Sequence, residues 1–108
     1  MEKLDLKGLC RQLAGELARE TNEEGLKTLF VDDEDGHFVV FLDDWRGPKR
    51  FYGPLLHLEV RGDKIWIHFD GTHEGVGQQL LDAGVPSSQI VLAWQHPSRR
   101  ALTEFAVA

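Results

Sequence analysis

Residues 52–72 read YGPLLHLEVRGDKIWIHFDGT, and apolar and polar side chains alternate along this stretch on both sides of Gly62-Asp63. Two alternating runs separated by a Gly-Asp pair are typical of a β-hairpin with a two-residue turn. Because side chains two positions apart share a face, placing Arg61 opposite Lys64 sets the register. One face is then apolar and is predicted to belong to the core, with Val60 opposite Ile65, Leu58 opposite Ile67 and Leu56 opposite Phe69.

The other face of the predicted hairpin is chemically mixed. It gathers two histidines, a tryptophan and two carboxylates, with Glu59 opposite Trp66, His57 opposite His68 and Leu55 opposite Asp70. A sheet face with large apolar groups and no helix of its own is typical of a surface for assembly or partner binding. We therefore expect any function of this sheet to lie on this face.

The remaining sequence predicts two helices and three further strands. Leucines at spacings of three and four are typical of an amphipathic helix, and Gly84 followed by Pro86 is a common helix stop. The predicted elements are a helix over about 5–20, strands over 29–31 and 37–42, the two hairpin strands, a helix from Thr72 to Gly84 and a strand over 90–94.

This order of elements predicts an α+β fold in a single domain spanning residues 1–108. An N-terminal helix is followed by a four-stranded antiparallel meander, a second helix and a short fifth strand. Both helices are expected on one face of the sheet, over the apolar side of the hairpin.

Composition narrows the class of protein. The 108-residue chain has a formal net charge of −6, whereas affinity for nucleic acid or an anionic membrane comes mainly from clustered Lys and Arg. The one cysteine, Cys10, has no partner for an internal disulfide, which favours a reducing compartment. No leader or membrane-spanning apolar run is found. We expect a cytoplasmic protein with no membrane attachment and no strong direct nucleic-acid binding, although a local basic patch remains at Arg46, Lys49, Arg50 and Arg61.

Motifs for catalysis or cofactor binding are weak. Three glycines near the second helix lack the Lys-Ser/Thr of a phosphate-binding loop, and the serines have no base at motif spacing. We expect no cofactor and no catalytic residue. A metal-dependent site at His57, His68 and Asp70 remains as an alternative, because imidazole and carboxylate groups are common metal ligands.

A series of motifs in order along the chain closely resembles the XisI family, the excision controlling factors of the fdxN element. The matching motifs are Trp45-x-Gly47-x-x-Arg50-x-Tyr52-Gly53, His57, Gly62-x-Lys64-Ile65-Trp66-Ile67, Asp70-Gly71-Thr72, Gly84-Val85-Pro86 with Ile90-Val91-Leu92, and Thr103-Glu104-Phe105-Ala106-Val107-Ala108. The resemblance covers nearly the whole chain. This sequence departs from the family pattern at His68, where a Gln is usual, and at His73, where a Glu is usual.

The resemblance implies a control role in site-specific DNA excision, without an assigned catalytic activity. The fdxN element is a DNA segment that cyanobacteria remove during heterocyst differentiation. Such a factor is expected to act through contacts with a companion protein, XisH, and/or a site-specific recombinase. Contacts between proteins need no phosphate-neutralising surface, which agrees with the acidic charge.

Seven residues of the matched motifs are candidates for partner contact, since Trp, Tyr and Arg are frequent at binding hot spots. They are Trp45, Arg50, Tyr52, His57, Trp66, His68 and Asp70. Structural roles stay open for two of them: Arg50 can pair with Asp43 or Asp44, and Asp70 with Thr72 can cap the second helix.

Two functions from different classes are therefore left open. The first is a non-enzymatic regulatory protein that works as a homo-oligomer and through a partner. The second is a metal-dependent or nuclease-associated enzyme module that uses His57, His68 and Asp70.

Overall fold

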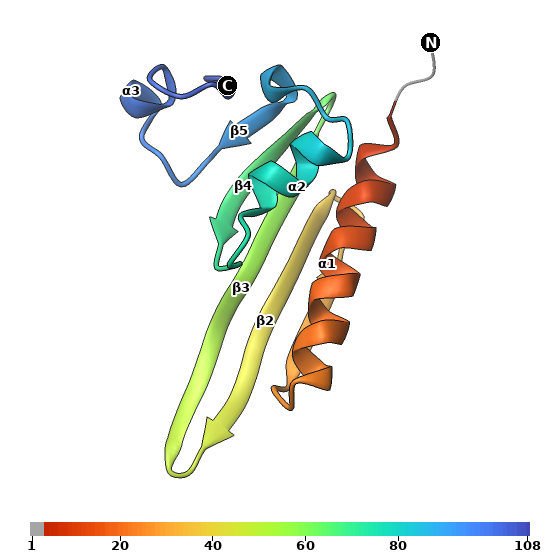
Figure 1. The fold of residues 1–108 in the computed structure, drawn as a ribbon, viewed down its shortest axis with the longest axis vertical. Coiled ribbons are helices and arrows are strands. Elements are labelled where there is room, and N and C mark those ends of the chain that lie inside the picture. Colours follow the sequence, from red (N-terminus) through yellow and green to blue (C-terminus); the bar gives the residue numbers. More distant parts are fainter. Residues whose placement is uncertain (1–3) are drawn as a thin grey trace.

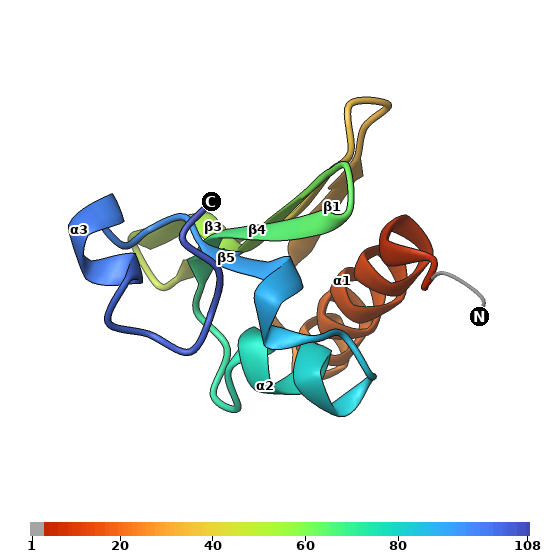
Figure 2. The same cartoon turned by 90° about the horizontal axis from the view of Figure 1, so that it is seen from above.

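The fold, described for residues 4–108 by a computed structural model, is a five-stranded sheet with α1 and α2 on one face (Figures 1 and 2). The α+β architecture predicted from the sequence is confirmed. Within the described residues, no helix has the length and apolar character needed to cross a bilayer. The elements are α1 (Leu6–Glu23), β1 (Thr28–Asp32), β2 (His37–Arg46), β3 (Lys49–Arg61), β4 (Lys64–Asp70), α2 (Val76–Asp82), a short 3-10 helix (Ser87–Gln89), β5 (Ile90–Leu92) and α3 (Pro97–Arg100).

The strands lie in sequence order, β1-β2-β3-β4-β5. The first four form the antiparallel meander that the sequence predicts. β5 pairs with β4 in parallel, because α2 carries the chain back across the sheet before β5 begins. We call the sheet face that carries α1 and α2 the helix face, and the opposite one the outer face.

α1 packs on the sheet through small side chains. Asp5 begins the helix by accepting a hydrogen bond from the backbone N–H of Gly8 at 2.9 Å. Cys10, Ala14 and Ala18 then recur on one stripe and are buried, which lets the helix approach the strands closely. They meet a sheet core in which Phe38, Leu58 and other apolar side chains are fully buried.

The hairpin of β3 and β4 keeps the predicted register from its turn as far as Leu58 and Ile67. Of the two turn residues only Gly62 has a positive φ, +58°, as the first position of a type II′ turn requires. Beyond that point the register shifts by one residue, so that His57 pairs with Phe69 and Leu56 pairs with Asp70. The predicted pairs of Leu56 with Phe69, His57 with His68 and Leu55 with Asp70 are therefore wrong.

A β-bulge at His68 causes this shift. One extra residue in β4 moves every later side chain of that strand to the other face. Phe69, predicted in the core, is instead 43% exposed. Asp70, predicted on the outer face, lies on the helix face and accepts a hydrogen bond from the backbone N–H of Val76 at 2.8 Å. The bulge thus supplies the cap of α2, which begins at Val76 rather than directly after Thr72.

A second irregularity, at Leu55, opens a long two-stranded projection. β1 pairs with β2 only as far as Leu42, and β4 pairs with β3 only as far as Leu56. Residues 43–53, which we call the arm, therefore have only each other as strand partners. In Figure 1 this ribbon extends well past the end of α1. At its tip Gly47, with φ +60°, makes the turn with Pro48.

A candidate interaction surface

Three histidines and a glutamate form one polar cluster on the outer face, made of two hydrogen-bonded pairs. His57 Nε2 lies 2.8 Å from His37 Nδ1, and His68 Nε2 lies 2.7 Å from Glu59 Oε1. His37 Nε2 approaches Glu59 Oε2 at 3.7 Å, while Arg61 donates its Nε–H to the same oxygen at 2.9 Å. We call His37, His57, Glu59 and His68 the histidine cluster.

The strand pairing explains why these side chains meet. His37 stands directly opposite Glu59 across β2 and β3. His57 and His68 are not paired residues, but the bulge leaves their ring centroids 4.6 Å apart, so the sequence correctly predicted that they lie close together. His37 was not among the residues predicted from the sequence. The turn at Gly47-Pro48 alone would place it opposite Leu58, on the other face, because the register of β2 and β3 shifts by one residue at Leu55.

Two pKa values in the cluster are lowered, so that both groups favour their deprotonated forms. The Arg61 hydrogen bond, helped by His68, lowers the pKa of Glu59 from 4.5 to about 2. Burial lowers the pKa of His57 below 6.5, and the neighbouring His68 and His37 lower it further. The carboxylate is therefore held charged, whereas the folded protein favours a neutral His57.

The cluster consists of two hydrogen-bonded pairs and not of ligands that converge on one point. The Nε2 atom of His57 faces His37, and that of His68 faces Glu59. Asp70, the third member of the metal site suggested by the sequence, lies on the helix face and bonds to Thr72 and Val76. Over residues 4–108, no group of three or more His, Cys, Asp or Glu side chains is arranged to hold a metal ion.

Trp66 lies beside the cluster on β4 and is half-buried. Two guanidinium groups cover its ring: Arg61 at 4.1 Å and Arg100 at 5.3 Å from the ring centroid. Arg100 is itself fixed by hydrogen bonds to the backbone carbonyls of Leu92 and Gln95. The outer face therefore presents Trp66 within a cationic frame instead of as an open apolar patch.

The arm continues the outer face with exposed aromatic side chains. Trp45 is 60% exposed and Tyr52 is 62% exposed. Arg50 lies between them, with its guanidinium 4.6 Å from the Tyr52 ring centroid and 6.0 Å from that of Trp45. The predicted ion pair of Arg50 is found with Asp43, at 3.2 Å. Of the seven candidate residues, the structure places Trp45, Arg50, Tyr52, His57, Trp66 and His68 on one continuous face and moves only Asp70 to the other.

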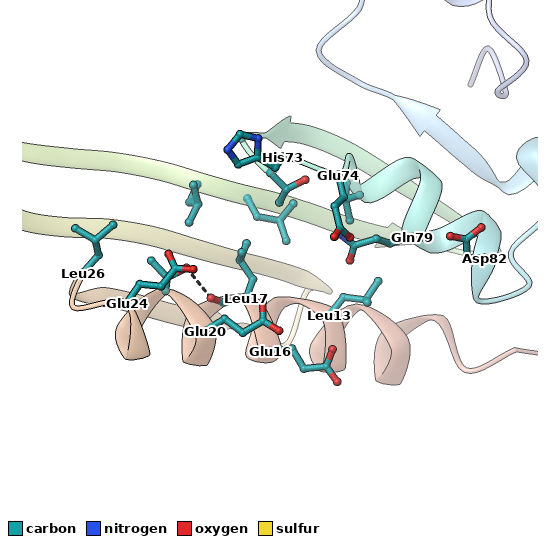
Figure 3. Close-up of a pocket in the computed structure, with 16 residues that line it drawn as sticks. Leu13, Glu16, Leu17, Glu20, Glu24, Leu26, His73, Glu74, Gln79 and Asp82 are labelled. Atoms are coloured by element: carbon teal, nitrogen blue, oxygen red, sulfur yellow. Dashed lines mark hydrogen bonds between the residues drawn. The ribbon is translucent and has the colours of Figure 1, made fainter.

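A groove of about 680 Å³ lies on the helix face, between α1 and the segment that contains α2 (Figure 3). Its lining includes apolar side chains, among them Leu13, Leu17 and Leu55. Five carboxylates also line it: Glu16, Glu20, Glu24, Glu74 and Asp82. This groove could not be predicted from local sequence patterns, because its two walls come from segments about fifty residues apart.

Comparisons with known proteins agree with this architecture. A family model described as "XisI protein" matches residues 3–107. No curated protein matches the chain. The crystal structure of a XisI-like protein from Anabaena variabilis ATCC 29413 is similar over 95% of this chain and 96% of that one, with 27% identity and a TM-score of 0.87. The fdxN element excision controlling factor XisI from the same organism is similar over 96% of this chain and 100% of that one, with 29% identity and a TM-score of 0.74.

Proposed function

The chain belongs to the XisI family, and from that premise we propose that it is a controlling factor in the site-specific excision of a DNA element. The similarity to a solved fdxN element excision controlling factor supports an element of that type. The chain acts through contacts with an XisH-like companion protein and/or a recombinase, and catalyses no reaction itself. It works in the cytoplasm, as a homo-oligomer.

The exposed aromatic pair on the arm is the observation that carries this proposal. Trp45 and Tyr52 both present more than half of their surface to solvent, with Arg50 between them. These three residue types dominate binding hot spots, because they bury a large area and still offer polar contacts. Large aromatic side chains that are exposed side by side are typical of a surface that a partner covers.

Electrostatics favours a protein as the partner of this surface. The chain carries 18 acidic against 12 basic side chains, so its overall field repels the phosphates of DNA. On the outer face the cations Arg50, Arg61 and Arg100 all stack on aromatic rings. Arg50 and Arg61 already pair with Asp43 and Glu59, but a guanidinium has five N–H donors, so these groups can still bind carboxylates of a partner protein.

Co-expression with the XisH-like companion, followed by a pull-down, tests the proposal. The wild-type chain should retain the companion, and the double variant Trp45→Ala, Tyr52→Ala should lose most of it. Trp94→Ala is the matched control, because Trp94 is also a largely exposed tryptophan (55%) but lies near β5, away from the arm. No retention by the wild type, or equal losses in the arm variant and the control, would contradict the proposal.

A further inference from the structure

We propose that the tip of the arm of one copy of this chain binds in the acidic groove of a second copy, and that the exchange is mutual. This contact would form the homo-oligomer named in the proposed function. The inference rests on that oligomer and not on binding of the companion protein. The partner is thus a second copy of the chain, recognised by charge.

The tip of the arm is strongly cationic. Residues 45–52, WRGPKRFY, contain three basic side chains and no acid. Arg46 and Lys49 stand directly opposite each other next to the turn, and both are exposed. Like charges facing each other across two strands destabilise a hairpin. An anionic partner would remove this repulsion.

The arm also lacks the support that a hairpin needs. A two-stranded ribbon is marginally stable in water unless a third strand or a helix packs on it. β1 and β4 end their pairing at Leu42 and Leu56, and Lys27 holds only the root of the arm, at Asp43 and Asp44. The face of the arm that carries Arg46 and Lys49 nevertheless also carries the large apolar ring of Phe51. Contact with another molecule supplies the missing packing surface.

The groove has the complementary charge and a suitable size. The carboxylates of Glu16 and Glu20 project from α1 and that of Glu24 from the residue that caps its end, with Glu74 and Asp82 across from them (Figure 3). Among residues 4–108, none of these five acids takes part in an ion pair, and no Lys or Arg lines the groove. A volume of about 680 Å³ accommodates a few side chains of a hairpin tip but not a folded domain.

The positions of arm and groove allow a closed pair. The groove lies at the root of the arm. Leu55, which lines the groove on β3, lies next to the root of the arm in sequence. Leu26, which also lines it, is followed by Lys27, whose carbonyl accepts a hydrogen bond from the backbone N–H of Asp43 in the arm. If two copies lie with their arms antiparallel, each tip therefore reaches the groove of the other. A two-fold axis then relates the two contacts, which gives a closed dimer and no open fibre.

A charge-swap experiment on the full-length chain tests this inference. One variant reverses the arm, Arg46→Glu with Lys49→Glu, and keeps the facing like charges at the turn. The other reverses the charge of the groove, with Glu20→Lys and Glu24→Lys. Both residues are exposed at the C-terminal end of α1, where cations interact favourably with the helix dipole. Each variant alone should dissociate about tenfold or more readily than the wild type in analytical ultracentrifugation, because its tips meet groove walls of like charge.

A mixture of the two variants should recover the dimer, since both contacts then join opposite charges. Arg99→Glu, on exposed α3, is the matched control and should dimerise like the wild type. Circular dichroism checks that every variant is folded. A monomeric wild type, unchanged dimers in both variants, or a mixture that stays monomeric would overturn the inference. Arg46 and Lys49 face away from Trp45 and Tyr52 on the arm, so this test and the companion pull-down can fail independently.

Discussion

Glu59 is the residue on which the outer face depends most. Its side chain is only 12% exposed and contacts Arg61, His68 and His37. A nearly buried carboxylate is stable in the charged form only while such donors surround it. These donors lower the pKa of Glu59 to about 2, with the Arg61 hydrogen bond as the largest cause.

We predict that Glu59→Gln lowers the free energy of unfolding at neutral pH by about 1 to 3 kcal/mol, because it removes hydrogen bonds to a charged group. The folded-state pKa is below the ordinary 4.5, so the stabilisation is present above pH 4.5 and is lost as the pH falls towards about 2. Urea unfolding across this range should show wild type and variant converging in acid. Glu104→Gln, at an exposed site, is the control. A constant difference at every pH would contradict the assignment.

His57 should make the stability of the protein sensitive to mild acid. Its pKa is lowered in the folded state by burial and by His68 and His37, against the opposing effect of Glu59 and Asp33. Below 6.5 the unfolded chain therefore binds more protons at this site than the folded chain. Stability is then complete above 6.5 and falls as the pH drops below it.

We predict that His57→Gln reduces this loss of stability between about pH 7.5 and about pH 5.5. Urea midpoints measured at several pH values in that range check the prediction. His73→Gln, in the exposed loop before α2, is the matched control and should follow the wild type. Parallel pH profiles for wild type and His57→Gln would show that His57 does not contribute.

At the level of elements, the sequence predicted the hairpin turn, the order of strands and the helix stripe, because each depends on local spacing. The bulge at His68 was not predictable in the same way. Alternation continues unbroken through Ile67, His68 and Phe69, so nothing local distinguishes an extra residue from a regular strand. The shift is favoured by a tertiary requirement, since it points Asp70 at the first turn of α2. For the same reason the sequence placed Asp70 with the histidines. His37 was missed because its position depends on a second shift, between β2 and β3 at Leu55.

We predict that Asp70→Ala destabilises the fold by about 1 to 2 kcal/mol, the usual cost of losing a helix cap. Its carboxylate accepts hydrogen bonds from the backbone N–H groups of Val76 and Thr72, at 2.8 and 2.9 Å. Asp70→Asn should retain part of this stabilisation, because its amide oxygen still accepts one bond. Thermal unfolding compares these variants with Asp35→Ala, in an exposed loop. If Asp70→Ala is no less stable than Asp35→Ala, the cap is unimportant.

At the level of the whole molecule, charge is unevenly distributed. Basic side chains gather at the tip of the arm and around Trp66, whereas the groove and the loop of residues 32–35 are acidic. Three cations at the tip of a narrow arm contact far fewer phosphates than tight DNA binding requires.

We predict that the purified chain alone does not bind duplex DNA with submicromolar affinity at physiological salt. Its formal net charge of −6 opposes the approach to phosphate, and the few cations available give only a weak, salt-sensitive attraction. Fluorescence anisotropy with a labelled duplex checks this. The arm variant Arg46→Glu with Lys49→Glu provides the baseline. Tight binding by the wild type that this variant abolishes would make the arm a DNA contact and refute the prediction.

The burial of Cys10 has a practical consequence for chemical labelling. Its side chain is fully enclosed between α1 and the sheet, and burial raises the pKa of the thiol to about 12. Maleimide and disulfide reagents attack the thiolate, so this sulfur reacts only when α1 leaves the sheet. The rate at which Cys10 is modified therefore measures how often the fold opens, and no substitution is needed to observe it. A second cysteine introduced on the surface would be the sole reactive thiol, and a fluorophore attached there would mark a single position.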